Sequence, residues 1–180
     1  MKIGLVAPMR GGKDTFGEVL VAEYGYTRVA FADAVKEVSA MCFPEECKTR
    51  ATARPIWQGV GNLLRQIDKD VWVNMLGRKV DSLGEDANIV VTDVRYFNEV
   101  EYLKSKGFTI IQILVDRDTI LERCKVNNPL FKEELLNHES EQLALNNIVG
   151  DICIINRGSL TDYKKSIHKL IGGIEDGNNL

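Results

Sequence analysis

The residues with the clearest chemical potential form one short run near the start of the chain: Arg10, Gly11, Gly12, Lys13, Asp14 and Thr15. An apolar run over residues 2–7 precedes them, and a helical pattern over residues 13–24 follows them. The N–H groups of a tight glycine loop and of a helix N-terminus together form a site for an anion. Lys13 adds a full positive charge where terminal phosphates would lie. The pattern therefore predicts a strand, a phosphate-binding loop and a helix.

Two positions depart from the common pattern Gly-x-x-x-x-Gly-Lys-Ser/Thr. Ala7 stands at the first glycine, and Asp14 stands where a hydroxyl usually contacts Mg²⁺. Either the Asp14 carboxylate replaces that hydroxyl as a hard oxygen ligand, or Thr15 supplies it from the next position. We expect ATP at this loop, with Mg²⁺. The structural alternative is a plain strand, turn and helix with a solvated lysine.

A second group of charged residues follows the apolar run over residues 88–92. Ligands of open α/β sheets bind at the carboxyl ends of strands, so Asp93 is expected near the metal and the substrate. Arg95 is a candidate for both catalysis and substrate binding, and Glu99 lies four residues beyond it, within reach on a helix. The alternative is a helix cap with a surface ion pair.

Further substrate-binding candidates follow the second predicted strand and occupy the predicted helices after it: Asp33, Lys36, Arg65 and Trp72. Asp33 is alternatively a simple helix cap. Trp72 is expected to pack rather than to stack on a base, although it is kept among the candidates.

Arginines also flank a polar segment over residues 127–147. Phosphoryl transfer needs cations that close over the phosphates and exclude water. Arg123 is the catalytic candidate for that role and Arg117 is a candidate for ATP binding. A solvated helix face is the alternative.

Strand and helix signals alternate to the end of the chain, which predicts an α/β fold with a mainly parallel sheet. Strands are expected at residues 2–7, 26–31, 88–92, 109–115 and 152–155. Helices are expected at residues 13–24, 33–41, 56–66, 96–106, 119–125 and 159–171, with another from residue 70. Residues 43–55 are interpreted as an irregular insert and residues 127–147 as a lid-like segment. No linker divides the chain, so one domain over residues 1–180 is expected.

Composition narrows the possible classes of protein. The chain has 180 residues, enough for one domain with a substantial core, and its net charge of −3 does not favour a nucleic-acid polymer as partner. Four cysteines and two histidines lack zinc-site spacing, and Cys153 in an apolar run is expected in the core. Because no apolar run reaches membrane-spanning length, we expect no membrane contact and a cytoplasmic location. A homodimer remains open.

The motifs together resemble those of P-loop deoxynucleoside monophosphate kinases, which are relatives of adenylate kinase and dephospho-CoA kinase. The matching segments are residues 12–15 (GKDT), 31–36 (FADAVK), 58–62 (QGVGN), 70–74 (DVWVN), 93–99 (DVRYFNE), 138–141 (HESE) and 151–160 (DICIINRGSL). The resemblance implies a three-layer P-loop domain with a five-stranded sheet and a lid. It also implies that Asn156 lies beside the adenine of ATP.

The activity implied by this resemblance is transfer of the γ-phosphoryl group of ATP to a nucleoside monophosphate. Arg95 and Arg65 are then expected to hold the acceptor phosphate. Two alternatives remain: another small-molecule kinase of the same architecture, such as a dephospho-CoA kinase, and a non-catalytic regulator that binds nucleoside triphosphates.

Overall fold

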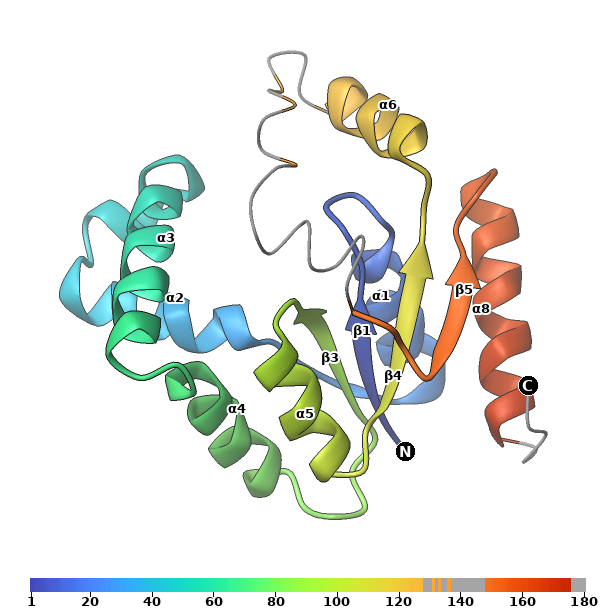
Figure 1. Ribbon diagram of the computed structural model, residues 1–180, viewed down its shortest axis with the longest axis horizontal. Coiled ribbons are helices and arrows are strands. Elements are labelled where there is room, and N and C mark those ends of the chain that lie inside the picture. The colour runs from blue at the N-terminus through green and yellow to red at the C-terminus, as the bar shows by residue number, and fades with distance from the viewer. Residues whose placement is uncertain (128–130, 132, 134–135, 137–147, 176–180) are drawn as a thin grey trace. The chain divides into compact units, whose positions relative to one another are not determined.

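A computed structural model describes residues 1–127, 131, 133, 136 and 148–175 (Figure 1). Its sheet has five strands in the order β2-β3-β1-β4-β5, and the pairs β1–β3, β1–β4 and β4–β5 are parallel. The strands are β1 (Lys2–Val6), β2 (Thr27–Val29), β3 (Ile89–Val94), β4 (Thr109–Leu114) and β5 (Ile152–Ile155). This arrangement confirms the predicted α/β class.

The α-helices lie between and after the strands as the sequence predicts, and three of them follow one another between β2 and β3. They are α1 (Lys13–Tyr24), α2 (Phe31–Cys42), α3 (Arg50–Ile67), α4 (Val71–Ser82), α5 (Phe97–Ser105), α6 (Arg117–Asn127) and α8 (Leu160–Glu175), with a short 3₁₀ helix η1 (Glu46–Lys48). Within the described ranges, no helix combines the length and the hydropathy that crossing a bilayer requires.

The chain divides into two compact units. The first comprises Met1–Arg28 and Asn88–Leu180, and the second comprises Val29–Ala87. The second unit therefore contains α2, η1, α3 and α4. In the sequence, these helices lie between β2 and β3. The interpretation of residues 1–180 as one functional domain stays a prediction.

The core of the first unit explains why its sheet is covered on both faces. Ile3 and Leu5 of β1 are fully buried in a cluster with residues of α1 and α8, including Phe16 and Ile167. Gly4 points to the opposite face, where a Cβ would lie 2.8 Å from Ile110 Cδ1 and 3.1 Å from a methyl group of Leu103 on α5. Alternate residues of β1 thus pack against helices on either side, which produces three layers.

Two glycines explain how α1 lies against the sheet. At Gly17 a Cβ would stand 2.7 Å from Thr92 Cγ2 of β3, so glycine permits the close approach of helix and strand. Gly25 ends the helix in a left-handed conformation (φ 69°), with its N–H donating to the carbonyl of Leu20. The observed bounds of α1 confirm the predicted helix over residues 13–24.

The second unit departs from the sequence-based expectations. Helix α2 begins at Phe31 with Ala30 as its N-cap, so Asp33 lies in the first turn and is not the cap. The segment 43–55 is not irregular, because η1 occupies part of it and α3 begins at Arg50. The Thr49 hydroxyl oxygen accepts the Thr52 N–H at 3.4 Å and starts α3, which then continues through Pro55. The polar composition of this segment did not indicate a helix because α3 is mostly exposed and buries few residues, Ala53 and Gly61 among them.

Two further expectations differ from the structure or lie outside it. Cys153 is exposed, because β5 is an edge strand and turns alternate side chains away from the core. Most of the predicted lid over residues 127–147, and the whole of segment 138–141, lie outside the described residues.

Candidate phosphate-binding site

The loop between β1 and α1 is a tight turn held by its own backbone. The Gly11 N–H donates to the Pro8 carbonyl at 3.0 Å. Arg10 (φ 58°) and Gly12 (φ 102°) both adopt left-handed backbone conformations. A Cβ at Gly12 would collide with the Asn156 amide nitrogen and lie 2.8 Å from the Tyr163 ring, so this position requires glycine. The sequence therefore closes the loop at its two glycines, as expected for a phosphate-binding loop.

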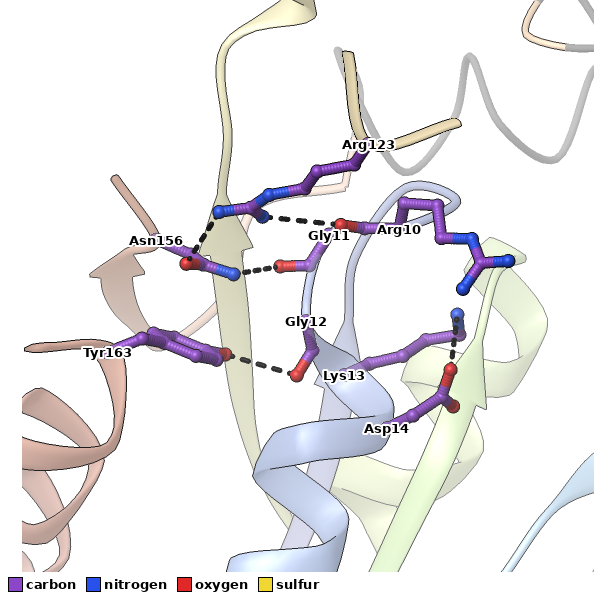
Figure 2. Close-up of polar contacts among 8 residues, drawn as sticks. All are labelled: Arg10, Gly11, Gly12, Lys13, Asp14, Arg123, Asn156 and Tyr163. Atoms are coloured by element: carbon purple, nitrogen blue, oxygen red, sulfur yellow. Dashed lines mark hydrogen bonds and ion pairs between the residues drawn. The ribbon is translucent and has the colours of Figure 1, made fainter. Parts of the chain in front are cut away.

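Helix α1 presents its N-terminus to this loop. Its N-cap is Gly12, whose carbonyl accepts the Phe16 N–H at 3.0 Å and which has no side chain to occupy the helix end. The positive end of the helix dipole therefore faces the loop. The Lys13 side chain is only 14% exposed, with its ammonium 3.8 Å from a carboxylate oxygen of Asp14, whereas Asp14 is 81% exposed. Figure 2 shows the Arg10 side chain extending to the same side of the loop.

Side chains from the C-terminal half of the chain bind the outside of the loop (Figure 2). Three consecutive loop carbonyls accept hydrogen bonds: Arg10 from Arg123 Nη1 (3.3 Å), Gly11 from Asn156 Nδ2 (2.8 Å) and Gly12 from the Tyr163 hydroxyl (3.3 Å). The second guanidinium nitrogen of Arg123 donates to Asn156 Oδ1 at 3.2 Å. The structure thus brings two predicted site residues, Arg123 and Asn156, to the loop.

Tyr163 was not predicted from the sequence. It lies in the first turn of α8, where a tyrosine belongs to no binding motif, and only the packing of α8 against α1 brings it to the loop. Its side chain is buried, and burial raises the pKa of the phenol well above its usual range despite the nearby charge of Arg123. The hydroxyl therefore stays protonated at neutral pH, where it can donate a hydrogen bond.

The residues after β3 lie beside the start of the loop. Val94 of β3 pairs with Val6 of β1, so Asp93 and Arg95 lie at the carboxyl edge from which the loop departs. Both side chains are partly exposed there. Ligands of such sheets bind at this edge, and membership of both residues in one site with Lys13 stays a prediction.

Glu99 supports the turn that follows β3. It is only 3% exposed, and one carboxylate oxygen accepts the N–H groups of Arg95 (2.7 Å) and Tyr96 (3.1 Å). The carboxylate caps α5 and shapes the turn that carries Arg95. One oxygen of Glu99 therefore serves the backbone of this turn, and contact of Glu99 with substrate stays a prediction.

The remaining substrate candidates belong to the second unit. The Lys36 ammonium lies 3.3 Å from Asp33 Oδ1 and 5.8 Å from the centre of the Trp57 ring, a partner that sequence reasoning missed. Trp72 is 1% exposed and its indole N–H donates to the Gly61 carbonyl at 3.0 Å, so it packs within the second unit as expected. Arg65 is partly exposed in the last turn of α3.

Arg117 and Thr15 complete the set of predicted residues. Arg117 is exposed at the first position of α6, six residues before Arg123. Thr15 is partly exposed in the first turn of α1, next to Asp14. Contact of either residue with ATP stays a prediction.

Comparison with known proteins identifies the fold. No protein-family model and no curated protein sequence matches the chain. Solved structures do: a dephospho-CoA kinase from Campylobacter jejuni is 18% identical with a TM-score of 0.58, covering 99% of this chain and 100% of that one. A shikimate kinase from Aquifex aeolicus is 19% identical with a TM-score of 0.53, covering 98% of both chains. A gluconokinase from Sinorhizobium meliloti is 12% identical with a TM-score of 0.57, covering 99% and 97%.

These neighbours share an architecture and differ in the substrates that their names state. The described residues have an α/β fold with a five-stranded sheet that is similar to the folds of P-loop kinases, which confirms the predicted fold class. Sequence identities below 20% extend the likeness no further than the fold.

Proposed function

We propose that the chain transfers the γ-phosphoryl group of ATP to a (deoxy)nucleoside monophosphate. The observation that carries this proposal is the loop itself. Lys13 and the N-terminus of α1 converge on one side of it, while its carbonyls are bonded on the other side. A loop of this polarity supports binding of a polyphosphate, and Asp93 and Arg95 lie at the same sheet edge.

In phosphoryl transfer the protein carries out little covalent chemistry. Aligning the donor with the acceptor and neutralising their charge lowers most of the barrier. In this proposal Lys13 and the loop N–H groups hold the donor phosphates. The planar guanidinium of Arg95 holds the acceptor phosphate through two parallel hydrogen bonds. Asp33, Lys36 and Arg65 border the acceptor.

The donor groups at the loop suit Mg²⁺ that arrives with the nucleotide. Within the described residues, no group of three or more acidic, histidine or cysteine side chains is arranged to hold an ion alone. Mg²⁺ is typically held by one or two carboxylates together with phosphate oxygens and water. Asp14, exposed beside Lys13, supplies such a carboxylate, with Thr15 and Asp93 as the other candidate ligands. Bound Mg²⁺ would neutralise charge on the phosphates.

Another small-molecule acceptor is the main alternative, because structures named as kinases of dephospho-CoA, shikimate and gluconate match this chain over nearly its full length. We favour a (deoxy)nucleoside monophosphate as the acceptor because residues 31–36 and 93–99 resemble motifs of deoxynucleoside monophosphate kinases. A regulator that binds ATP without transferring phosphate is the non-enzymatic alternative.

A panel of acceptors tests these possibilities. The purified chain is incubated with ATP and MgCl₂, and ADP release is measured with each (deoxy)nucleoside monophosphate, dephospho-CoA, shikimate and gluconate. We expect acceptor-dependent ADP release with at least one nucleoside monophosphate, and its loss in Lys13→Ala, which excludes a contaminating kinase. Release only with another acceptor would support the main alternative. ATP binding without release for any acceptor would favour the regulator.

A further inference from the structure

The loop carbonyls are held in one direction by side chains that lie far away in the sequence. Asn156 donates to the carbonyl of Gly11, and Tyr163 donates to the carbonyl of Gly12, which also accepts the Phe16 N–H of α1. In a planar trans peptide, the N–H of the next residue points opposite to the carbonyl. Outward carbonyls on Gly11 and Gly12 therefore turn the N–H groups of Gly12 and Lys13 toward the inside of the loop.

We propose that Asn156 and Tyr163 are positioning residues that hold the phosphate-binding loop in this N–H-inward orientation. The inference rests on the proposed function, because the orientation matters only if the loop binds phosphate. It also gives Asn156 a role distinct from the adenine contact implied by the family resemblance, since its amide bonds the backbone of the loop.

The peptide between Gly11 and Gly12 needs such a brace more than any other in the loop. Neither flanking residue has a Cβ, so little resists rotation of the whole peptide unit. Rotation would turn the Gly11 carbonyl oxygen inward, where its partial negative charge would oppose a phosphate oxygen. A hydrogen bond worth about 1 kcal/mol changes the ratio of the two orientations by roughly fivefold.

Arg123 fixes the direction of the Asn156 amide. A guanidinium only donates, so its contact at 3.2 Å requires Oδ1, which leaves Nδ2 to face the Gly11 carbonyl. Asn156 is 4% exposed, and with Tyr163 it fills the space that a Cβ on Gly12 would need. The brace is therefore packed against the loop and has a single orientation.

Direct binding measures the effect on the loop independently of catalysis. We would titrate ADP with MgCl₂, and separately inorganic tripolyphosphate, into the wild-type chain and its variants by calorimetry. Asn156→Leu removes both amide contacts without adding charge, and Asn156→Asp keeps an acceptor for Arg123 but replaces the donor to Gly11. Tyr163→Phe keeps the ring, and Tyr102→Phe on α5 makes the same chemical change away from the loop.

We expect Kd for both probes to rise about tenfold in each Asn156 variant and about threefold in Tyr163→Phe, with no change in Tyr102→Phe. A second readout is the ¹H–¹⁵N resonance of Gly12, which should shift on adding tripolyphosphate to wild type and lose that response in the Asn156 variants. Thermal unfolding identifies any variant that fails to fold, and Tyr163→Phe then carries the test.

Three outcomes would overturn the inference. If folded Asn156→Leu and Tyr163→Phe bind as Tyr102→Phe does while Lys13→Ala does not bind, the loop binds phosphate without this brace. If Asn156→Asp alone weakens binding, the added charge explains the loss. If the wild-type chain binds neither probe, the proposed function fails, and the inference fails with it.

Discussion

At the scale of single residues, the site depends on where each charge lies relative to the loop. Lys13 is mostly covered, whereas Asp14 beside it is open to solvent. A cation partly removed from water interacts more strongly with phosphate than an exposed one does, because the local dielectric constant is lower. This contrast predicts that the two neighbours contribute differently: Lys13 through direct charge, and Asp14 through the metal.

Replacing Lys13 by Ala should lower kcat/KM by roughly two orders of magnitude or more, the scale of losing one charge contact in the transition state. Steady-state ADP release measures it, and an unchanged thermal midpoint shows that the fold survives. Lys169→Ala, an exposed lysine of α8, is the matched control. Wild-type turnover in Lys13→Ala would remove the loop from the mechanism.

Asp14→Asn should raise the Mg²⁺ concentration that gives half-maximal rate, because an amide is a weaker ligand for a hard cation than a carboxylate is. Asp14→Ser should recover part of the rate, since a hydroxyl is the common ligand at this position. Rates measured across a range of MgCl₂ test both. An unchanged Mg²⁺ dependence would leave Thr15, Asp93 or water as the ligand.

Arg95→Lys should raise the KM of the acceptor by about tenfold and lower kcat, while the Kd of ADP stays the same. Lysine keeps the charge but lacks the planar pair of donors that matches a phosphate. The backbone N–H that binds Glu99 is retained, so the turn is unchanged. Weaker ADP binding with an unaltered acceptor KM would place Arg95 on the donor side.

At the scale of elements, α1 combines two glycines with left-handed backbones in different surroundings. Gly12 begins the helix against Asn156 and Tyr163, while Gly25 ends it with nothing within 4 Å of the place that a Cβ would occupy. Both positions disfavour side chains by backbone conformation, but only one is also crowded. Comparing the same substitution at Gly12 and at Gly25 therefore distinguishes backbone strain from steric overlap with Asn156 and Tyr163.

Gly12→Ala should therefore lower the free energy of unfolding by more than the roughly 1 kcal/mol expected of Gly25→Ala, and should abolish detectable ADP binding. Gly25→Ala should bind ADP as wild type does. Chemical denaturation and calorimetric titration give the two quantities. Equal losses of stability together with wild-type ADP affinity in Gly12→Ala would show that the loop tolerates a Cβ.

At the scale of the whole molecule, the first unit is joined by contacts between segments far apart in sequence. Asp151, just before β5, accepts the Lys104 ammonium of α5 at 2.6 Å and the Ile110 N–H of β4 at 2.8 Å. Burial alone would raise the pKa of Asp151, but these two hydrogen bonds outweigh it and leave the pKa below the ordinary value. The carboxylate thus links a helix to the edge of the sheet.

The depressed pKa predicts a dependence of stability on pH. Asp151 stabilises the fold above the unfolded pKa of about 3.9, and that stability is lost as the pH falls through the lower folded value. Asp151→Asn should therefore lower the free energy of unfolding at pH 7, with the difference from wild type shrinking below about pH 4. Urea denaturation of both proteins at pH 7 and at pH 3 measures this difference.

Glu45→Gln provides the control, because it removes an exposed pair with Lys48 of the same 2.6 Å length. We expect that change to cost less than about 0.5 kcal/mol. If Asp151→Asn lowers the free energy of unfolding by the same amount at pH 3 and pH 7, then packing and not charge explains the loss of stability.

What the sequence by itself determined was local. The glycines of the loop before α1 and the alternation of apolar runs and helical patterns each act within a few residues. Such signals predicted the order of elements, the loop with Lys13, and the placement of Asp93 and Arg95 at a strand end. Periodicity and capping are properties of short segments, so a sequence displays them directly.

Only the tertiary structure decided how the site is held. The partners of the loop carbonyls lie 113, 145 and 151 residues away, and no local pattern marks Tyr163 as one of them. The burial of Trp72, whose indole N–H donates to the Gly61 carbonyl on another helix, is likewise a tertiary property. These outcomes depend on which faces of distant elements meet, and that depends on the packing of the sheet and helices rather than on any single segment.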